Sequence, residues 1–195
     1  VMGNVYHTKE EMIDCVNAFY KGMVQRSEEM KRHPNYKTGE NYAYLGLPPC
    51  FLIFDEYVAF FEMLGTKESV GLLSQLKKIV MLGRQAGYFL IVACQRPDAK
   101  YFSDGIRDNF NFRVGLGRIS ELGYGMLFGS DVKKQFFQKR IKGRGYCDVG
   151  TSVISEFYTP LVPKGHDFLQ TIGSLAQARQ DGTCLLYTSP SPRDR

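Results

Sequence analysis

The chain has 195 residues, a formal net charge of +5 and 44% hydrophobic residues. This is the composition of a globular protein with room for one sizeable core. No apolar run approaches the length needed to span a bilayer and no signal peptide is visible, so no part of this sequence is expected to cross a membrane. The mild positive charge permits nucleic-acid binding without requiring it.

Four cysteines precede the C-terminal tail, with no Cys-x-x-Cys and no histidine at metal-ligand spacing. They are Cys15, Cys50, Cys94 and Cys147. We expect reduced and mostly buried thiols in a cytosolic setting.

Both ends of the sequence look unnatural. Residues from Cys184 to Asp194 match the translation of a transposase-end sequencing adapter. We therefore expect 184–195 to be a scar that is not native and exclude it from the fold. Without this tail the formal charge falls to +4, because it carries two arginines and one aspartate. The start at Val1-Met2-Gly3 does not resemble a natural start either, which predicts a piece of a longer reading frame.

The first segment with a clear period is helical. Thr8 and Glu11 form a capping box, and apolar residues then recur at helical spacing as far as His33-Pro34. The pattern predicts an amphipathic helix of about six turns. Residues 34–49 are rich in Asn, Gly, Tyr and Pro without a period, which indicates a loop.

The next segment is an apolar run over 49–54 that stops at two adjacent acids, Asp55 and Glu56. A short apolar run bounded by prolines predicts a strand of a parallel sheet, buried on both faces. Ligands of open α/β sheets bind at the carboxyl ends of such strands. An Asp there can hold Mg²⁺ while the neighbouring Glu orients or deprotonates water, as in the Walker B motif of P-loop ATPases. A buried strand that ends in solvated acids has the same pattern.

A second strand makes the two acids more informative. Residues 57–64 and 67–86 have helical spacing, the latter ending at Gly87, and 88–93 is again a short apolar run. Strand, helix and strand in this order predict a right-handed parallel crossover. The same sheet edge would then carry Asp55, Glu56 and Gln95, and Gln95 could sense a γ-phosphate and position water.

The C-terminal half has weaker patterns. Residues 112–116 are a candidate third strand, followed by a glycine-punctuated segment through Gly129. Residues 133–141 could be helical, 146–149 with 153–157 indicate a hairpin, and a last helix is expected to start near Asp167.

Three stretches together resemble the FtsK/SpoIIIE family of DNA-pumping ATPases, namely Phe54-Asp55-Glu56, Gly83-Arg84-Gln85-Ala86-Gly87 and Ala93-Cys94-Gln95-Arg96-Pro97. Further stretches, 35–42, 104–108, 120–125 and 157–163, resemble the FtsK-type coupling proteins of Gram-positive conjugative transposons. The resemblance covers 8–173. It implies that 1–183 is the C-terminal part of an α/β fold, a partial RecA-like P-loop NTPase motor domain with a mainly parallel sheet. It also implies a homo-hexameric ring around double-stranded DNA that uses ATP and Mg²⁺.

The resemblance also assigns roles to four residues of the site. Asp55 would be the Mg²⁺-associated acid, Glu56 the catalytic base and Gln95 the sensor. Arg84 matches the arginine finger, which would reach the nucleotide of a neighbouring subunit. Read from the residues alone, Arg84 is a cation favourably placed at a helix C-terminus.

DNA contacts carry over less completely. Arg96 falls where the family places a DNA-facing channel residue, although it could instead cap a strand and pair with a local acid. Two further basic channel positions are Glu121 and Gly125 here, and Arg118 nearby could supply a replacement charge. A basic run indicates phosphate contact or, equally, a solvated helix face. Its members are Lys133, Lys134, Lys139, Arg140, Lys142 and Arg144.

The phosphate-binding loop G-x-x-x-x-G-K-[ST] is absent from the sequence. In the family this loop precedes the helix that begins near Thr8, so truncation is the expected explanation, and this piece alone should bind nucleotide poorly. The resemblance implies a coupling protein of conjugative transfer, with a relaxase and channel proteins as partners. The full-length protein would lie at the cytoplasmic face of the membrane, anchored upstream, and the piece itself would be soluble. Two alternatives are a protein-export ATPase and a non-catalytic ring or docking module.

Overall fold

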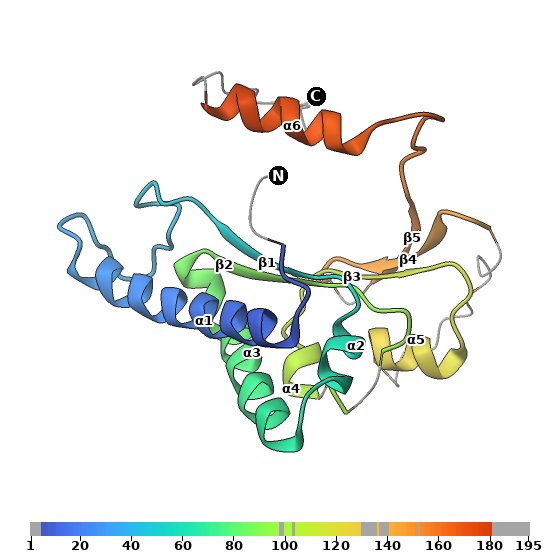
Figure 1. Ribbon diagram of the computed structural model, residues 1–195, viewed down its shortest axis with the longest axis horizontal. Helices are drawn as coiled ribbons and strands as arrows, with labels where there is room; N and C mark the ends of the chain where they lie inside the picture. The colour runs from blue at the N-terminus through green and yellow to red at the C-terminus, as the bar shows by residue number, and fades with distance from the viewer. Residues whose placement is uncertain are drawn as a thin grey trace. The chain divides into compact units, whose positions relative to one another are not determined.

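A computed structural model describes residues 5–97, 100–102, 104–129, 136, 141–151 and 153–180. The chain divides into two compact units, residues 7–160 and a second unit formed by 1–6 with 161–195, which are described separately. The larger unit holds two sheets, a parallel pair and a three-stranded antiparallel sheet (Figure 1). The expected mixture of helices and strands with a parallel sheet is confirmed.

The first helix, α1, runs over Lys9–Arg32, and its capping box is present. The Glu11 backbone N–H donates to Thr8 Oγ1 over 3.4 Å, and the Thr8 hydroxyl donates to Glu11 Oε2 over 2.8 Å. The helix ends at the C-cap His33, directly before Pro34. Three apolar residues on one face, Val16, Met23 and Met30, are buried. The predicted amphipathic helix is confirmed.

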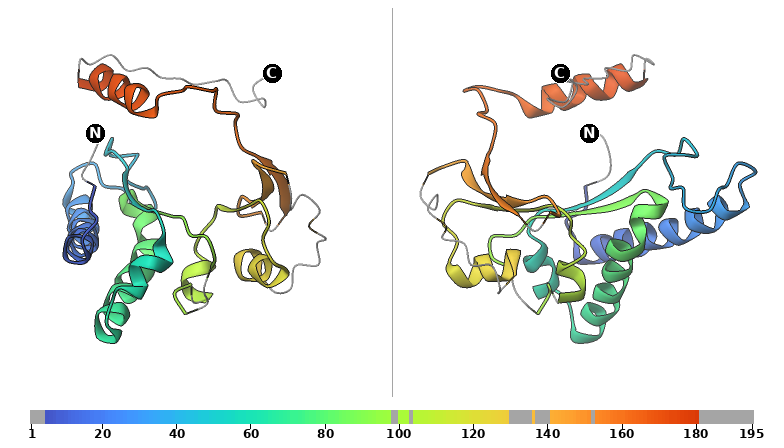
Figure 2. Two further views of the ribbon diagram at one scale, coloured as in Figure 1. Left: turned by 45° about the vertical axis from the view of Figure 1, so that its right-hand side comes forward. Right: turned by 180° about the vertical axis from the view of Figure 1, so that it is seen from behind.

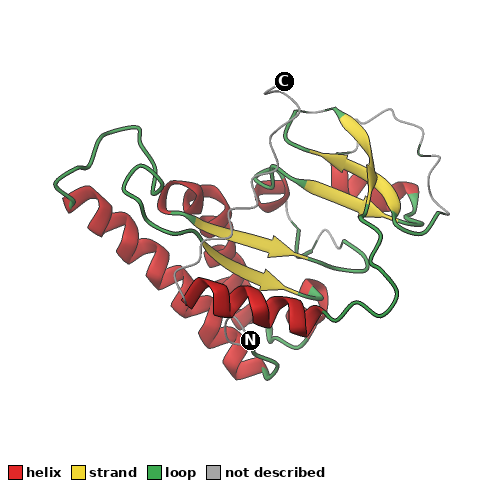
Figure 3. Cartoon of the chain, turned by 90° about the horizontal axis from the view of Figure 1, so that it is seen from above, coloured by secondary structure: helices red, strands yellow, loops and turns green. Residues whose placement is uncertain are grey.

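Strands β1 (Cys50–Phe54) and β2 (Tyr88–Val92) pair in parallel, with Cys50 opposite Tyr88 and Phe54 opposite Val92 (Figure 3). Two helices connect them, α2 (Tyr57–Glu62) and α3 (Thr66–Ala86). The predicted strand–helix–strand crossover is therefore present, with element ends within a few residues of those expected.

One face of the strand pair carries the core. Leu52 and Phe54 pack with buried residues of α1, α2 and α3, which lie on the same side of the pair (Figures 1 and 2). On the other face Phe51, Ile53 and Ile91 are 54%, 67% and 47% exposed. The prediction that these strands are buried on both faces is thus wrong for the part of the chain that the structure describes, because all three helices cover one face.

Gly87 ends α3 in the left-handed conformation, with φ of 77°. A Cβ atom at this position would lie 2.5 Å from the Tyr42 ring, so no other residue fits without displacing the loop before β1. That loop is also held by the Tyr42 backbone N–H, which donates to the Gln85 carbonyl over 3.0 Å. Gly87 thus ends α3 as predicted and also leaves room for Tyr42 of the loop to pack against it.

The second sheet consists of β3 (Arg113–Leu116), β4 (Arg144–Asp148) and β5 (Ile154–Tyr158), paired antiparallel. The predicted hairpin is confirmed. Two helices that we did not predict precede and follow β3, the four-residue α4 (Asp104–Arg107) and α5 (Glu121–Phe128).

Helix α5 forms despite its two glycines because it is capped and packed. The Gly123 backbone N–H donates to the Ser120 hydroxyl over 3.1 Å. Tyr124 and Phe128 of α5 are buried in a small aromatic core with Tyr146 of β4. Tertiary packing here outweighs a poor intrinsic helix propensity.

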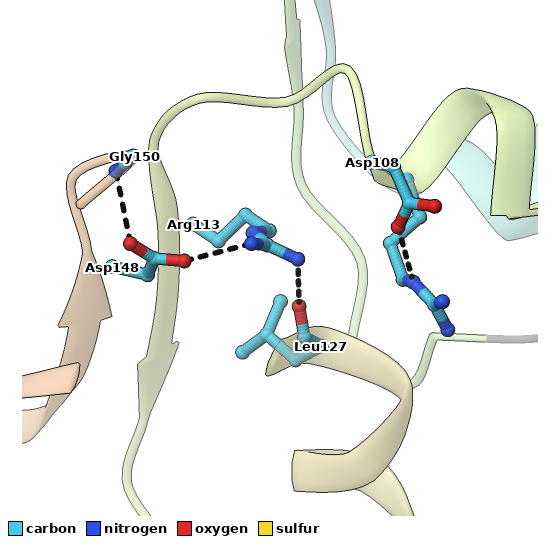
Figure 4. Close-up of polar contacts among 6 residues, drawn as sticks. Asp108, Arg113, Leu127, Asp148 and Gly150 are labelled. Carbon is cyan, nitrogen blue, oxygen red and sulfur yellow. Dashed lines mark hydrogen bonds and ion pairs between the residues drawn. The ribbon is translucent and has the colours of Figure 1, made fainter. Parts of the chain in front are cut away.

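A buried ion pair joins these elements (Figure 4). Arg113 Nη2 lies 2.7 Å from Asp148 Oδ2, and Arg113 Nη1 donates to the Leu127 carbonyl over 3.2 Å. Asp148 as a whole is 3% exposed, and its other carboxylate oxygen, Oδ1, accepts a hydrogen bond from the Gly150 N–H. One arginine therefore links β3, β4 and α5.

The smaller unit contains α6 (Phe168–Gln180). It begins where expected, because the Gln170 backbone N–H donates to the Asp167 carboxylate over 3.0 Å. Its first turn exposes Phe168 and Leu169. Among the helices within the described ranges, none combines the length and the apolar character needed to cross a membrane.

Candidate active site

The end of β1 is not a regular strand end. The Ala93 backbone N–H, just beyond β2, donates to the Phe54 carbonyl over 2.8 Å, and the Ala93 carbonyl accepts from the Tyr57 N–H over 2.9 Å. In a regular parallel ladder these two bonds would flank one residue of the partner strand. Here they flank Asp55 and Glu56, so one extra residue is accommodated as in a β-bulge, a device that re-aims side chains beside active sites.

Glu56 has an unusual backbone conformation in this turn. With φ of 62° and ψ of 59° it is left-handed, and no other non-glycine residue of the described ranges has a positive φ. This conformation costs a non-glycine residue roughly 1–2 kcal/mol. Such strain persists where the surroundings hold it, often at functional sites. The two bonds to Ala93 supply that hold.

The neighbouring strand end is close to Glu56. Burial raises the pKa of the Cys94 thiol, and the negative charge of Glu56 raises it further. Gln95 follows directly and is exposed, as is Asp55. The structure therefore brings Asp55, Glu56 and Gln95 to one end of the strand pair, as the sequence predicts. Their catalytic roles stay a prediction.

The Cys94 thiol can report on this arrangement. We expect Glu56→Gln to lower the pKa of Cys94, because a neutral neighbour no longer disfavours the thiolate. The measurement is the pH dependence of Cys94 alkylation in a chain whose other cysteines are serines. Glu62→Gln, at the far end of α2, is the matched control. An unchanged thiol pKa in Glu56→Gln would show that the two side chains are not close.

Sequence reasoning did not single out Tyr57, which follows the two acids. Its side chain is 1% exposed, and burial, with a smaller contribution from Cys94, raises its pKa well above the ordinary value. The hydroxyl therefore stays protonated and donates to the Tyr101 carbonyl over 3.3 Å. An aromatic residue next to an apolar strand looks like ordinary core, so the sequence holds no signal for this bond.

Arg84 lies at the opposite end of the strand pair from Asp55 and Glu56. It is exposed in the last turn of α3, next to the start of β2, whereas the two acids lie at the far end of the strands. The length of β2 separates the two ends by about 13 Å. Within one chain the structure does not bring Arg84 to the acidic turn.

The expected DNA-binding residues are dispersed. Arg96 is exposed one residue after Gln95, at the acidic end of the strand pair. Arg118 is exposed two residues after β3, a strand of the antiparallel sheet. Glu121 and Gly125 both lie in α5. Lys133 and Lys134, most of the predicted helix over 133–141 and the tail 184–195 lie outside the described residues.

The donor set suits Mg²⁺ held together with a substrate rather than a metal held by protein alone. Among the described side chains, no three His, Cys, Asp or Glu residues cluster as metal ligands. Mg²⁺ typically takes one or two carboxylates plus substrate phosphates. The exposed carboxylate of Asp55 at a strand end fits this requirement.

Comparison with solved structures defines the class of protein. The conjugation coupling protein TcpA of pCW3, solved with ATPγS, superposes with a TM-score of 0.62 at 18% identity, covering 84% of this chain and 49% of TcpA. The cytoplasmic domain of the type VII secretion ATPase EccC of Thermomonospora curvata gives 0.59 at 20% identity, over 84% of this chain and 19% of the solved EccC chain. EssC of Geobacillus thermodenitrificans (ATPases 2 and 3) gives 0.57 at 15% identity, over 90% of this chain and 32% of EssC. The chain thus has the fold of part of a P-loop ATPase motor domain.

Sequence comparison narrows the class to a family. No family model matches the chain. The FtsK domain-containing protein YdcQ of Bacillus subtilis (strain 168) is 57% identical over 191 residues, which cover 98% of this chain. The chain belongs to the FtsK-domain proteins. It spans only 40% of the length of that relative.

Proposed function

We propose that this chain is part of an ATP-driven double-stranded DNA translocase that acts as a coupling protein in conjugative transfer. The observation that carries the proposal is the turn after β1, which presents two adjacent carboxylates beside the end of a parallel strand. Phosphoryl transfer needs mainly positioning and charge stabilisation, so acids fixed on a rigid sheet edge suit it.

Each residue at this edge has a separate task. Asp55 would hold Mg²⁺, which neutralises charge on the phosphates when bound. Glu56 would orient the attacking water and accept its proton. Gln95 would hydrogen-bond near the γ-phosphate and keep that water in place. Because the two bonds to Ala93 fix the peptide groups on either side of the acids, these positions need little rearrangement.

Arg84 fits the family's arginine finger only between subunits. Its distance from the acidic turn within one chain means that it would serve the nucleotide of a neighbouring copy. Head-to-tail contacts of this kind form a ring when the rotation between copies closes, as in the homo-hexamer that we propose from the resemblance. The alternative for Arg84 remains a cation that stabilises the C-terminus of α3.

The DNA part of the proposal rests on the sequence resemblance to coupling proteins. The similar structure named as a conjugation coupling protein is 18% identical and supports the fold alone. Arg96, Arg118, Lys133 and Lys134 are the residues proposed to contact DNA phosphates, since such contacts are independent of sequence and suit a translocase. A relaxase and channel proteins would be partners, with membrane attachment supplied by upstream segments at the cytoplasmic face.

A protein-export motor is the second candidate. Glu121 and Gly125 stand where the family has basic channel residues, and two of the similar structures are EccC, named as a type VII secretion ATPase, and EssC. Their identities of 20% and 15% support the fold alone. The 57% identity to an FtsK-domain protein does not by itself separate the two candidates.

The test is ATP hydrolysis, with and without double-stranded DNA, by the longest reading frame containing this chain, ended before Cys184. We expect DNA stimulation that falls steeply with salt. Glu56→Gln should reduce hydrolysis by about 10²- to 10⁴-fold. Hydrolysis indifferent to DNA would favour protein export. No hydrolysis by an assembled ring with bound nucleotide would favour a docking module.

A further inference from the structure

Tyr57 connects the acidic turn to two points on the segment that follows β2. Its backbone N–H donates to the Ala93 carbonyl over 2.9 Å, and its hydroxyl donates to the Tyr101 carbonyl over 3.3 Å. Because Tyr57 directly follows Glu56, the first bond fixes the peptide group between the two residues, and the second anchors the side chain of the residue next to that carboxylate.

Aromatic packing fastens the far end of the same segment. The Tyr57 ring lies 4.7 Å from the Phe102 ring and 4.8 Å from the Phe61 ring, measured between centroids. Phe61 in turn stacks on Tyr101 at 5.3 Å. Tyr57, Phe61 and Tyr101 are 1%, 1% and 4% exposed, so residues 101–102 are clamped onto α2.

The segment between these two attachment points has two basic residues, Arg96 and Lys100, and one acid, Asp98, which lies outside the described residues. Arg96 is exposed, and the Lys100 ammonium lies 4.9 Å from the centre of the Tyr101 ring. Any anion that contacts these side chains pulls on a stretch of chain whose ends are both tied to Tyr57.

The contacts of Tyr57 matter for Glu56 because the Glu56 backbone is left-handed. A residue in this strained conformation keeps it only while neighbouring contacts enforce it. On its C-terminal side the Glu56 carbonyl accepts a hydrogen bond from the Phe60 backbone N–H over 3.3 Å, and the next residue, Tyr57, makes the contacts described above. A small displacement of Tyr57 therefore changes the direction in which Glu56 is presented.

We propose that Tyr57 is a positioning residue, whose hydroxyl bond to Tyr101 couples the 95–102 segment to the orientation of Glu56. The inference rests on the proposed function, because it takes DNA phosphates as the anions that engage Arg96 and Lys100. DNA contact and water activation are then linked through one side chain.

The test is Tyr57→Phe in the longest reading frame containing the chain, which keeps the ring and removes the hydroxyl. We expect the ratio of DNA-stimulated to basal hydrolysis to fall by about two- to tenfold, the effect of one hydrogen bond. A purely structural role would lower both rates together and leave the ratio unchanged. Tyr88→Phe is the matched control, because it removes a hydroxyl at the opposite end of the strand pair and should leave the ratio unchanged.

The outcomes separate the two proposals. A wild-type protein that DNA does not stimulate overturns the proposed function. Stimulation of the same ratio in wild type and Tyr57→Phe overturns the role of Tyr57 alone. Amide hydrogen exchange of the wild type gives a second measurement that does not depend on the variant. Protection at 56–57 should change with that of 95–102 when DNA is added, and a change confined to 95–102 contradicts the link.

Discussion

Arg84→Ala and Glu56→Gln are each expected to abolish ATP hydrolysis, and a mixture of the two variants is expected to recover part of it. Loss of an arginine finger costs about 10³- to 10⁵-fold in rate. In a mixed ring, a subunit with intact Glu56 can lie next to one with intact Arg84. About a quarter of the interfaces have both residues when the variants mix at random in a head-to-tail ring.

The measurement is steady-state hydrolysis by each variant alone and by an equimolar mixture after reassembly. Lys77→Ala is the matched control, since Lys77 is exposed two turns earlier on the same face of α3 and should hydrolyse ATP normally. If the mixture stays at background while wild type mixed with either variant is active, Arg84 does not act between subunits. If Arg84→Ala lowers the stability of the protein but leaves hydrolysis normal, Arg84 is instead the cation that stabilises the C-terminus of α3.

Asp148→Ala is expected to lower the free energy of unfolding by about 3–5 kcal/mol, because it leaves the Arg113 guanidinium buried without a counter-charge. The Arg113 and Asp148 side chains are only 18% and 4% exposed. Urea unfolding followed by circular dichroism would measure the difference.

Asp108, also drawn in Figure 4, provides a matched control for Asp148→Ala. Arg107 Nε lies 3.3 Å from Asp108 Oδ1, but the Asp108 side chain is 61% exposed. Asp108→Ala should therefore change stability by less than about 1 kcal/mol. Equal effects of the two substitutions would mean that the Arg113 pair is solvated in solution. Arg113→Met combined with Asp148→Leu should recover most of the loss, since no buried charge then remains.

Local patterns predicted most of the first half of the larger unit. Thr8 and Glu11 carry the start of α1 in their side chains, and Gly87 ends α3 because its backbone needs the left-handed conformation. The parallel pairing followed from a helix between two short apolar runs. That order also placed Asp55, Glu56 and Gln95 at one edge, since strand ends of the same sense meet there.

The features that sequence reasoning missed depend on contacts between distant residues. The extra residue opposite Ala93 and the strain at Glu56 arise from strand register, which a single strand does not encode. The pairing of Arg113 with Asp148 likewise needs the register of β3 against β4. Helix α5 was missed because its glycines argue against a helix, while its stability comes from the aromatic packing around Tyr124.

The bare face of the strand pair has a practical consequence for anyone producing this stretch of protein alone. Phe51, Ile53 and Ile91 are exposed apolar side chains on one face of paired strands, the kind of surface that associates with itself in concentrated solution. Light scattering should thus show aggregates that grow with protein concentration, and Ile53→Lys should suppress them while leaving Asp55 and Glu56 unchanged.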